Sequence, residues 1–165
     1  MEDNSAERWK VYDDNPAGSR ISNVWKNDEQ TSRVISFEGV GLNNSYIIGS
    51  STENDEAWNN ATEKMIQWSM KYNEYFRVFI RVKTTDGKKW LVYTPKNVDS
   101  GNLASGNVHH ALGANTYDGT WRTFTRDLEA DLKEYQPENA LVSVLGFLIQ
   151  GSGEIDDIKM FEKYD

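Results

Sequence analysis

Residues Ile66–Val82 alternate between apolar and polar side chains, and the polar side has the chemistry of a binding surface. Alternate residues of a β-strand point to one face, so the apolar residues of this stretch predict a core side. The other side carries an amide, three cations and an aromatic ring. Amide and guanidinium groups form paired hydrogen bonds with hydroxyls or carboxylates, and a ring beside them can stack on a sugar. The residues on this side are Gln67, Ser69, Lys71, Arg77, Phe79 and Arg81.

The charge of this side is opposite to that of the whole chain. The 165 residues include 18 basic and 26 acidic side chains, which gives a net charge of −8. Three cations close together in an acidic protein favour a polar or anionic ligand. A plain solvated surface would carry the same residue types, so both interpretations stay open. The net negative charge lacks the basic footprint that duplex DNA requires, and we expect no nucleic-acid partner.

Aromatic and histidine side chains elsewhere could extend such a face. Trp90 and Tyr93 differ by an odd number of positions, so one faces the core and the other does not. We expect Tyr93 on the binding face, together with one of the adjacent residues His109 and His110, and we select His109. Trp58 lies among acidic and Asn residues in a predicted loop, where it is either a loop anchor or a stacking platform.

The sequence contains few signatures of catalysis or of metal binding. It has no cysteine, no Gly-x-Ser-x-Gly and no Gly-rich phosphate loop. His109 and His110 would face opposite sides of a strand, and no zinc motif is present. Asp13 follows the first predicted strand and Asp156 lies in the last one. Because terminal strands of a sandwich often lie side by side, we predict that these two carboxylates bind a structural calcium ion; solvated acids are the alternative.

The elements that must position these residues are almost all strands. Short alternating runs separated by Gly, Asn, Asp and Ser predict an all-β domain, a two-sheet antiparallel β-sandwich of jelly-roll type spanning residues 1–165. Residues 1–8 are predicted to be a disordered tail. No apolar run approaches the roughly 20 residues that cross a bilayer, so we expect no membrane partner. Predicted strands cover residues 9–12, 21–25, 33–37, 45–48, 66–71, 76–83, 88–94, 108–112, 120–125, 141–150 and 154–161.

Three further features of the chain refine this fold. Residues 72–74 are predicted to join their two flanking strands as a hairpin, and Asp86-Gly87 is a second tight-turn signal. Residues 127–135 space Leu128 and Leu132 at a helical interval after a capping Asp127, which predicts one short surface helix with a solvated acidic face. Residues 141–149 are nearly all apolar and predict a central strand covered on both sides.

Three stretches resemble the jelly-roll carbohydrate-binding modules of bacterial secreted polysaccharide-degrading enzymes and surface proteins. They are SRVISFEGVGLNNSYIIG, DGTWRTFTRDLEADL and GSGEIDDIKMF, and the likeness spans about Val11 to Phe161. The resemblance implies a module outside the cell or on its surface, tethered to a larger protein. It also implies that Asp156 ligates a structural calcium. No sugar-binding residue set transfers from these families.

We therefore predict a non-catalytic module that binds a polysaccharide on a concave sheet face, with an acidic glycan as one option. The alternative is a polysaccharide lyase acting by β-elimination on a uronate, because residues of the required types are present. An interaction domain without sugar specificity is a third possibility. The lyase candidates are Gln67, Arg77 or Arg81, Tyr93 and His109. The predicted binding residues are Gln67, Lys71, Arg77, Phe79, Arg81, Tyr93, His109 and Trp58, with Asp13 and Asp156 for calcium.

Overall fold

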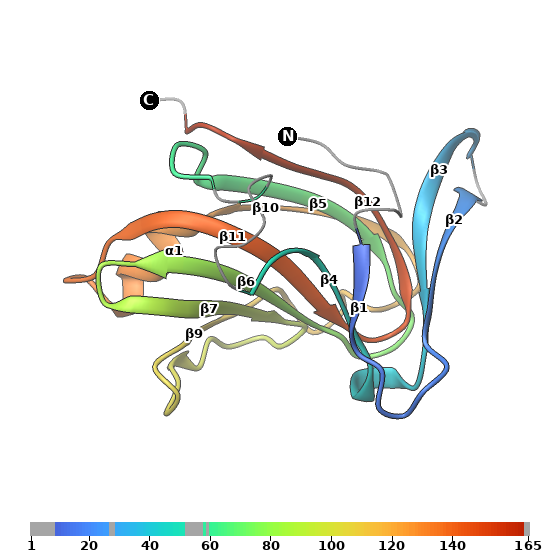
Figure 1. Ribbon diagram of the computed structural model, residues 1–165, viewed down its shortest axis with the longest axis horizontal. Helices are drawn as coiled ribbons and strands as arrows, with labels where there is room; N and C mark the ends of the chain where they lie inside the picture. The colour runs from blue at the N-terminus through green and yellow to red at the C-terminus, as the bar shows by residue number, and fades with distance from the viewer. Residues whose placement is uncertain (1–8, 27–28, 52–57, 59, 164–165) are drawn as a thin grey trace.

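The structure is a computed structural model that describes residues 9–26, 29–51, 58 and 60–163. Within that part the chain forms a two-sheet β-sandwich, as the alternation predicts (Figure 1). The larger sheet has seven strands in the order β1 (Trp9–Asp13), β4 (Ser45–Gly49), β11 (Leu141–Gln150), β6 (Arg77–Thr84), β7 (Gly87–Thr94), β9 (Val108–Ala111) and β8 (Gly101–Asn102). The smaller sheet has five strands in the order β10 (Trp121–Asp127), β5 (Met65–Lys71), β12 (Gly153–Phe161), β3 (Glu29–Glu38) and β2 (Arg20–Lys26).

The described strands pair as an antiparallel sandwich requires, with one exception. β7 and β9 run parallel, and a long connection through β8 joins them. The strand at 141–150 is central as predicted, because β11 lies between β4 and β6. The two-residue strand β8 has no alternation to reveal it and was not predicted.

Aromatic rings fill the space between the two sheets. Trp68 is fully buried, and its ring centroid lies 5.4 Å from the ring of Phe124 and 5.4 Å from that of Phe147. Trp9 makes edge contacts with Phe37 and Phe147 from the other side of the core. Burying rings of this size supplies much of the hydrophobic free energy that holds the sheets together.

The predicted hairpin at residues 72–74 is wrong. β5 pairs with β10 and β12, whereas β6 pairs with β11 and β7, so the chain crosses from one sheet to the other after β5. Alternation shows which side of each strand is buried, and both sheets of a sandwich bury one side. The same pattern therefore fits a hairpin and a crossing between sheets.

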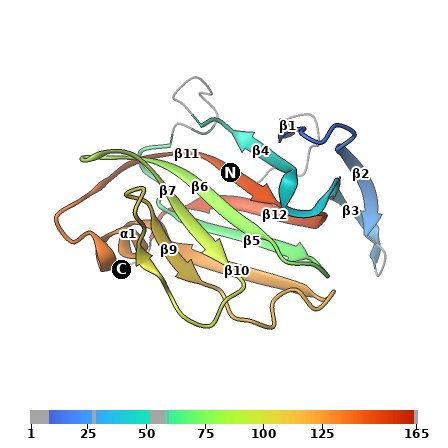
Figure 2. The ribbon, with the colours of Figure 1, turned by 90° about the horizontal axis from the view of Figure 1, so that it is seen from below.

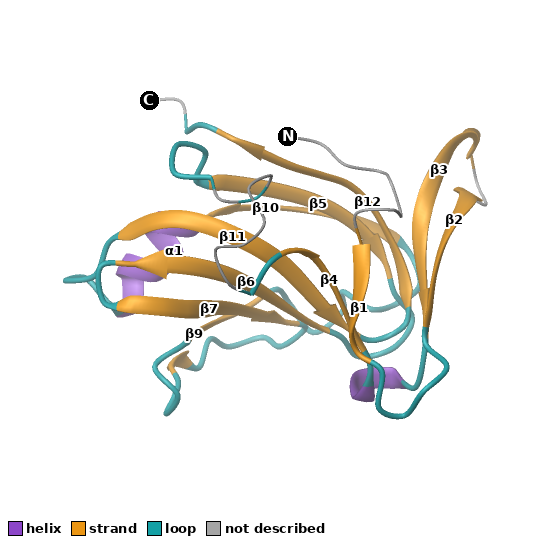
Figure 3. Ribbon diagram, in the orientation of Figure 1, coloured by secondary structure: helices purple, strands orange, loops and turns teal. Residues whose placement is uncertain are grey.

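The helix is confirmed at α1 (Leu128–Tyr135), and a short 3-10 helix, η2 (Gly41–Asn43), lies at the opposite end (Figure 3). The Asp127 carboxylate caps α1 by accepting a hydrogen bond from the Ala130 backbone N–H at 3.1 Å. The acidic face of α1 is not entirely solvated, because Asp131 is buried against the sandwich.

The structure does not test two predictions on the chain as a whole, the disordered tail and the absence of a membrane partner. The predicted tail, residues 1–8, lies outside the described residues. Among the described helices, none combines the length and the apolar character that crossing a bilayer requires. The fold places each candidate residue on one of two outer faces or in the core between them.

Candidate functional site

The outer face of the seven-stranded sheet contains a hollow of about 230 Å³, which we call the sheet-face hollow. Figure 2 shows β7, β6, β11 and β4 side by side in this sheet. In a flat sheet β1 and β7 would lie about 19 Å apart, four spacings of about 4.8 Å. Residues of both strands line the one hollow, which is the arrangement that a curled sheet gives. The lining residues are Tyr12, Asp13, Ser45, Phe79, Trp90, Asn107, Leu148 and Gln150.

Three aromatic rings of this hollow come from three different strands. Tyr12 of β1 is 52% exposed. The register of β1 against β4 shifts between Val11 and Asp13, so a bulge there lets consecutive residues line the same hollow. Phe79 and Trp90 are half-buried, and their ring centroids lie 6.0 Å apart in an edge-to-face arrangement. The rings thus form an apolar floor that remains open to solvent.

Arg81 borders this floor and is held in a fixed orientation. Its guanidinium lies over the Trp90 ring, 4.8 Å from the centroid, and its Nε–H donates to the Ser51 carbonyl oxygen at 3.0 Å. Burial lowers the pKa of Arg81, while the nearby Tyr12 phenol acts in the opposite direction. A guanidinium is protonated in proteins even when it is partly buried, and the N–H groups other than Nε–H remain as donors. Arg77 lies on the same side of β6, 5.9 Å from the Tyr75 ring.

Amide side chains complete the wall of the hollow. Asn107 accepts a hydrogen bond from the Trp90 backbone N–H at 2.9 Å. Gln150 lies opposite Arg77 on β6 and Ser45 on β4. Its Oε1 atom is covered and accepts no hydrogen bond from any described residue. Rings beside amide, hydroxyl and guanidinium groups suit a ligand that has both flat apolar faces and many hydroxyls.

The polar residues predicted from Ile66–Val82 are divided between the two sheets. Phe79, Arg77 and Arg81 lie on the outer face just described. Gln67 and Lys71 belong to β5 and therefore lie on the outer face of the other sheet. There the Gln67 Nε2–H donates to Thr125 Oγ1 at 2.8 Å. The prediction that all of these residues share one face is wrong, because the chain changes sheets between them.

Three further predicted residues are not exposed in the hollow. Two of them are fully buried, and the third is covered just below the surface. Tyr93 is fully buried, and its hydroxyl donates to Asp131 Oδ2 at 2.6 Å. Trp58 is fully buried as a loop anchor. His109 lies under the surface, where its Nδ1 accepts from the Ser100 N–H at 2.8 Å, and burial lowers the pKa of its imidazole. The residues proposed for a lyase therefore do not converge on one site.

The predicted calcium ligands are also separated. Asp13 lines the sheet-face hollow and pairs with β4, whereas Asp156 lies in register with Ser69 in the other sheet. The first described strand and the last strand belong to different sheets, so these two carboxylates do not form a common site. Calcium binding itself stays a prediction, but Asp13 and Asp156 cannot be the two ligands of one ion.

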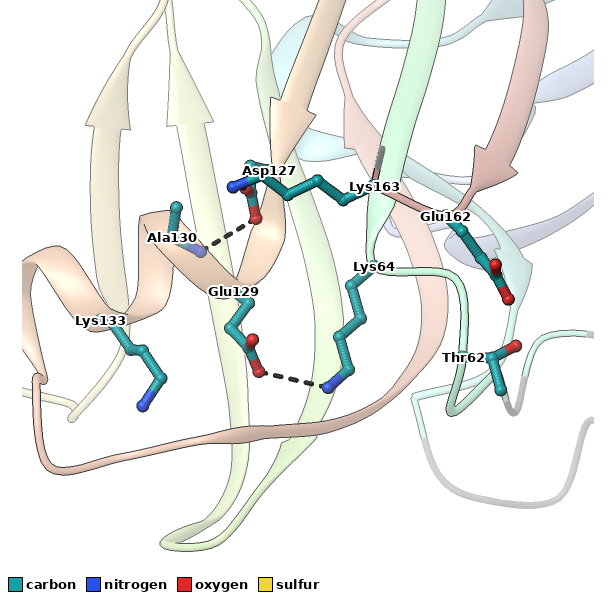
Figure 4. A pocket seen from close by; sticks show the side chains of 8 residues that line it. All are labelled: Thr62, Lys64, Asp127, Glu129, Ala130, Lys133, Glu162 and Lys163. Carbon is teal, nitrogen blue, oxygen red and sulfur yellow. Dashed lines mark hydrogen bonds and ion pairs between the residues drawn. The ribbon is translucent and has the colours of Figure 1, made fainter. Parts of the chain in front are cut away.

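A larger depression of about 510 Å³ lies where α1 meets the end of β12 (Figure 4). Four of its six charged side chains form two ion pairs: Lys64 Nζ lies 3.2 Å from Glu129 Oε2, and Lys163 Nζ lies 2.8 Å from Asp127 Oδ2. No aromatic ring is among its lining residues. Paired charges and the lack of rings make it a weaker candidate for a ligand that stacks.

Sequence reasoning missed Tyr12, Trp90, Asn107 and Gln150 as members of the site. A signal for Trp90 was present, since the Asp86-Gly87 turn places Trp90 opposite Arg81. For Tyr12, no pattern in the sequence marks the bulge that turns it toward the hollow.

No known family profile matches the chain, and no curated protein matches it. Among the solved structures that are distantly similar to the chain, two of the three described here are carbohydrate-binding modules. The family 11 carbohydrate-binding module of the cellulosomal cellulase Lic26A-Cel5E of Clostridium thermocellum has a TM-score of 0.42 and 14% identity, over 100% of this chain and 96% of that one. A Trichoderma reesei endo-1,4-β-xylanase has a TM-score of 0.42 and 9% identity, over 92% and 96%. BiXyn10A CBM1 in its apo form has a TM-score of 0.34 and 9% identity, over 93% and 97%. With TM-scores below 0.5, these similarities carry no argument about what this chain does.

Proposed function

We propose that this domain is a non-catalytic carbohydrate-binding module that holds a polysaccharide in the sheet-face hollow. The observation that carries the proposal is the group of three open rings, Tyr12, Phe79 and Trp90, surrounded by amide and guanidinium groups on one curled sheet. Sugar rings present apolar C–H faces that stack on aromatic rings, and hydroxyls at their edges that need polar partners. The resemblance of three sequence stretches to carbohydrate-binding modules supports the same function.

The size of the hollow fits a short stretch of a longer chain. Its volume of about 230 Å³ is below the roughly 300–1,000 Å³ of sites that enclose a whole drug-sized ligand. A polymer lying across the curled sheet would place a few of its sugar rings in the hollow and continue past it on both sides. Arg77 and Arg81 favour a polymer that carries carboxylates, because a guanidinium binds a carboxylate through paired hydrogen bonds.

Affinity electrophoresis tests the proposal with gels that contain neutral or uronate-bearing polysaccharides. The wild-type domain should be retarded by at least one uronate-bearing polymer. Trp90→Ala removes a ring of the floor and the support of Arg81, and it should lower the affinity by more than tenfold. Tyr12→Ala should also lower the affinity, by roughly five- to 150-fold if a sugar gains as much from one ring as the about 1–3 kcal/mol that a stacked base gains.

Tyr117→Ala is the matched control, since Tyr117 is exposed, does not line the hollow, and contacts Tyr75 at a ring distance of 5.9 Å. It should bind like the wild type. Melting temperatures of all variants show whether each one is folded. The proposed site would be contradicted if no polysaccharide retarded the wild-type domain. It would also be contradicted if Tyr12→Ala and Tyr117→Ala lost the same amount of affinity.

We also propose that the module acts outside the cell or at its surface, attached to a larger protein. This part rests on the sequence resemblance, because modules of this type concentrate a catalytic or surface protein on its polymer. No geometric observation favours the lyase alternative, since its candidate residues are divided among two sheets and the core.

A further inference from the structure

A second cluster of polar residues lies where α1 packs beside β9, away from the sheet-face hollow. His110 of β9 is only 2% exposed. Its Nδ1 atom lies 3.2 Å from Asp99 Oδ2 and 3.7 Å from Glu134 Oε2. Glu134 belongs to the last turn of α1. One ligand atom from each of these three residues lies within 4.8 Å of the others. The three side chains thus converge from strand β9, helix α1 and the loop between β7 and β8.

The hydrogen bond on the far side of the imidazole fixes which nitrogen faces this point as an acceptor. His110 Nε2 lies 2.8 Å from the backbone carbonyl oxygen of Asp131. A carbonyl only accepts, so Nε2 carries the hydrogen and the neutral ring has its lone pair on Nδ1. That lone pair faces two carboxylates, which are also acceptors. Three acceptors that face one another favour a positive partner between them, although the Tyr135 hydroxyl already donates to Asp99 Oδ2.

The two separations from His110 Nδ1 match those of ligands around one small cation, and all three ligand atoms lie within 4.8 Å of one another. Tetrahedral Zn²⁺ with bonds of about 2.0–2.1 Å places neighbouring ligand atoms about 3.3 Å apart, close to the observed 3.2 and 3.7 Å. The supporting bonds are those of a metal site, where the second ring nitrogen and the carboxylates are held by outer groups. Asp99 accepts from the Ala111 N–H and from the Tyr135 hydroxyl, each at 2.7 Å.

We propose that Asp99, His110 and Glu134 form a three-ligand site for a divalent transition metal, with Zn²⁺ the best fit. An imidazole with two carboxylates suits Zn²⁺, whereas Ca²⁺ takes six to eight oxygen ligands. The Glu134 side chain is 56% exposed, so an ion can reach the cluster from solvent on that side. The site is separate from the sheet-face hollow, because none of its residues lines that hollow.

A proton on His110 Nδ1 is the alternative partner for the two carboxylates. It would satisfy the same geometry without any metal, and the two possibilities differ in a direct measurement. A metal site gives saturable binding of one ion per chain, while a protonated ring gives none. The measurement needs no glycan, so its outcome is independent of the proposed carbohydrate binding.

Isothermal titration of Zn²⁺ into the full chain tests the site, after dialysis against a chelator and then into chelator-free, phosphate-free buffer at pH 7.5. We expect one Zn²⁺ per chain and a higher melting temperature of the Zn²⁺-loaded protein. Glu134→Gln keeps the shape of an exposed side chain, and should lower the Zn²⁺ affinity at least tenfold. Glu138→Gln removes the same charge from an exposed residue outside the cluster and should bind like the wild type.

Ca²⁺ is titrated in parallel and should bind at least a hundredfold more weakly than Zn²⁺ in the wild type. Circular dichroism confirms that both variants are folded. Three outcomes would overturn the proposal: no saturable Zn²⁺ binding by the wild type, equal affinity in Glu134→Gln, or tighter binding of Ca²⁺ than of Zn²⁺.

Discussion

Asp131 shows how a buried charge is held at the α1 end of the sandwich. Its carboxylate accepts from Arg126 Nε at 2.8 Å and Nη2 at 2.9 Å, and from the Tyr93 hydroxyl at 2.6 Å. The Arg126 guanidinium also lies 5.2 Å from the Tyr93 ring centroid. Burial, and then the Asp131 charge, raises the pKa of Tyr93 well above its usual value, so the phenol stays a donor. The carboxylate and its two partners therefore form one unit.

Arg126→Met should destabilise the domain strongly, because it leaves the Asp131 carboxylate buried with one neutral donor. Removing one partner of a buried ion pair costs roughly 3–5 kcal/mol. Arg20→Met makes the same change in the exposed Arg20–Glu38 pair, where a loss of less than about 1 kcal/mol is expected. Urea unfolding measures both free energies of unfolding, and equal losses would contradict a buried unit around Asp131.

Asp118 should make stability depend on acid pH in a defined direction. Hydrogen bonds from the Thr120 hydroxyl and from Arg122 lower the pKa of this carboxyl to about 2. In the unfolded chain it is about 3.9. The lowered pKa stabilises the fold above about pH 4, and this stabilisation is lost as the pH falls through about 2.

Asp118→Asn should therefore melt at a lower temperature than the wild type at pH 7. The difference between the two melting temperatures should shrink as the pH falls from about 4 toward about 2. Thermal melts monitored by circular dichroism across this range measure it. A difference that is constant from pH 7 down to pH 2.5 would show that the charge of Asp118 contributes nothing.

At the scale of elements, β4 and β11 approach closely through a pair of glycines. Gly49 lies opposite Gly146 in the register of the two strands. A Cβ atom on Gly146 would lie 2.7 Å from both the backbone nitrogen and the carbonyl oxygen of Ser50. Real Cβ atoms do not come this close to backbone atoms, so the strands would have to separate.

Gly146→Ala should cost roughly 1–3 kcal/mol of unfolding free energy, as overpacked positions do. Val142→Ala on the same strand changes an exposed side chain and should cost less than about 0.5 kcal/mol. Guanidinium unfolding provides both values. Wild-type stability in Gly146→Ala would mean that the two strands are not tightly packed at this point.

The strands and the helix were predictable from the sequence because their signals are local. Period-two alternation and the Asp86-Gly87 turn gave β6 and β7 to within a residue or two. That turn also sets the register, which pairs Arg81 with Trp90 and the core residue Val78 with Tyr93. The choice of Tyr93 over Trp90 for the binding face was thus an error that the sequence itself could have corrected.

Other features were not predictable because they depend on distant parts of the chain. The side of β5 that carries Gln67 was recognised as outer, but its sheet is set by pairing with β10 and β12 far along the sequence. Asp99, His110 and Glu134 meet because β9 and α1 pack together. No spacing motif in the sequence predicts this cluster. Local pattern therefore predicts faces, and long-range pairing decides which faces coincide.

At the scale of the whole molecule, the two outer faces differ in how their polar groups are used. On the five-stranded sheet, side chains pair with each other across strands, as in the Ser69–Thr123 contact at 2.7 Å. On the seven-stranded sheet the rings remain open, and Arg81 is fixed against one of them. Among the described residues, the open rings and Arg81 make the second face the better surface for a ligand that stacks.

Arg77→Ala with Arg81→Ala should therefore reduce retardation by a uronate-bearing polysaccharide by more than tenfold. Gln67→Ala with Lys71→Ala changes the opposite face and should leave it within twofold of the wild type. Affinity electrophoresis on one gel compares both pairs. Equal losses in the two double variants would place the binding surface elsewhere.

The net charge of −8 should give binding an unusual salt dependence. An acidic polymer is repelled by the whole molecule at long range, whereas Arg77 and Arg81 attract its carboxylates at contact. The screening length is about 30 Å at 0.01 M salt, 10 Å at 0.1 M and 3 Å at 1 M. Raising salt to about 0.1 M therefore removes more repulsion than attraction, and further salt weakens the contact itself.

Affinity for a uronate-bearing polysaccharide should consequently rise between 0.01 and about 0.1 M NaCl and fall toward 1 M. A neutral polymer bound by ring stacking and hydrogen bonds should show almost no change over the same range. Titration of intrinsic tryptophan fluorescence measures both, since Trp90 lines the hollow. Salt-independent binding of equal strength to both polymers would assign recognition to the rings and amides and leave Arg77 and Arg81 no electrostatic role.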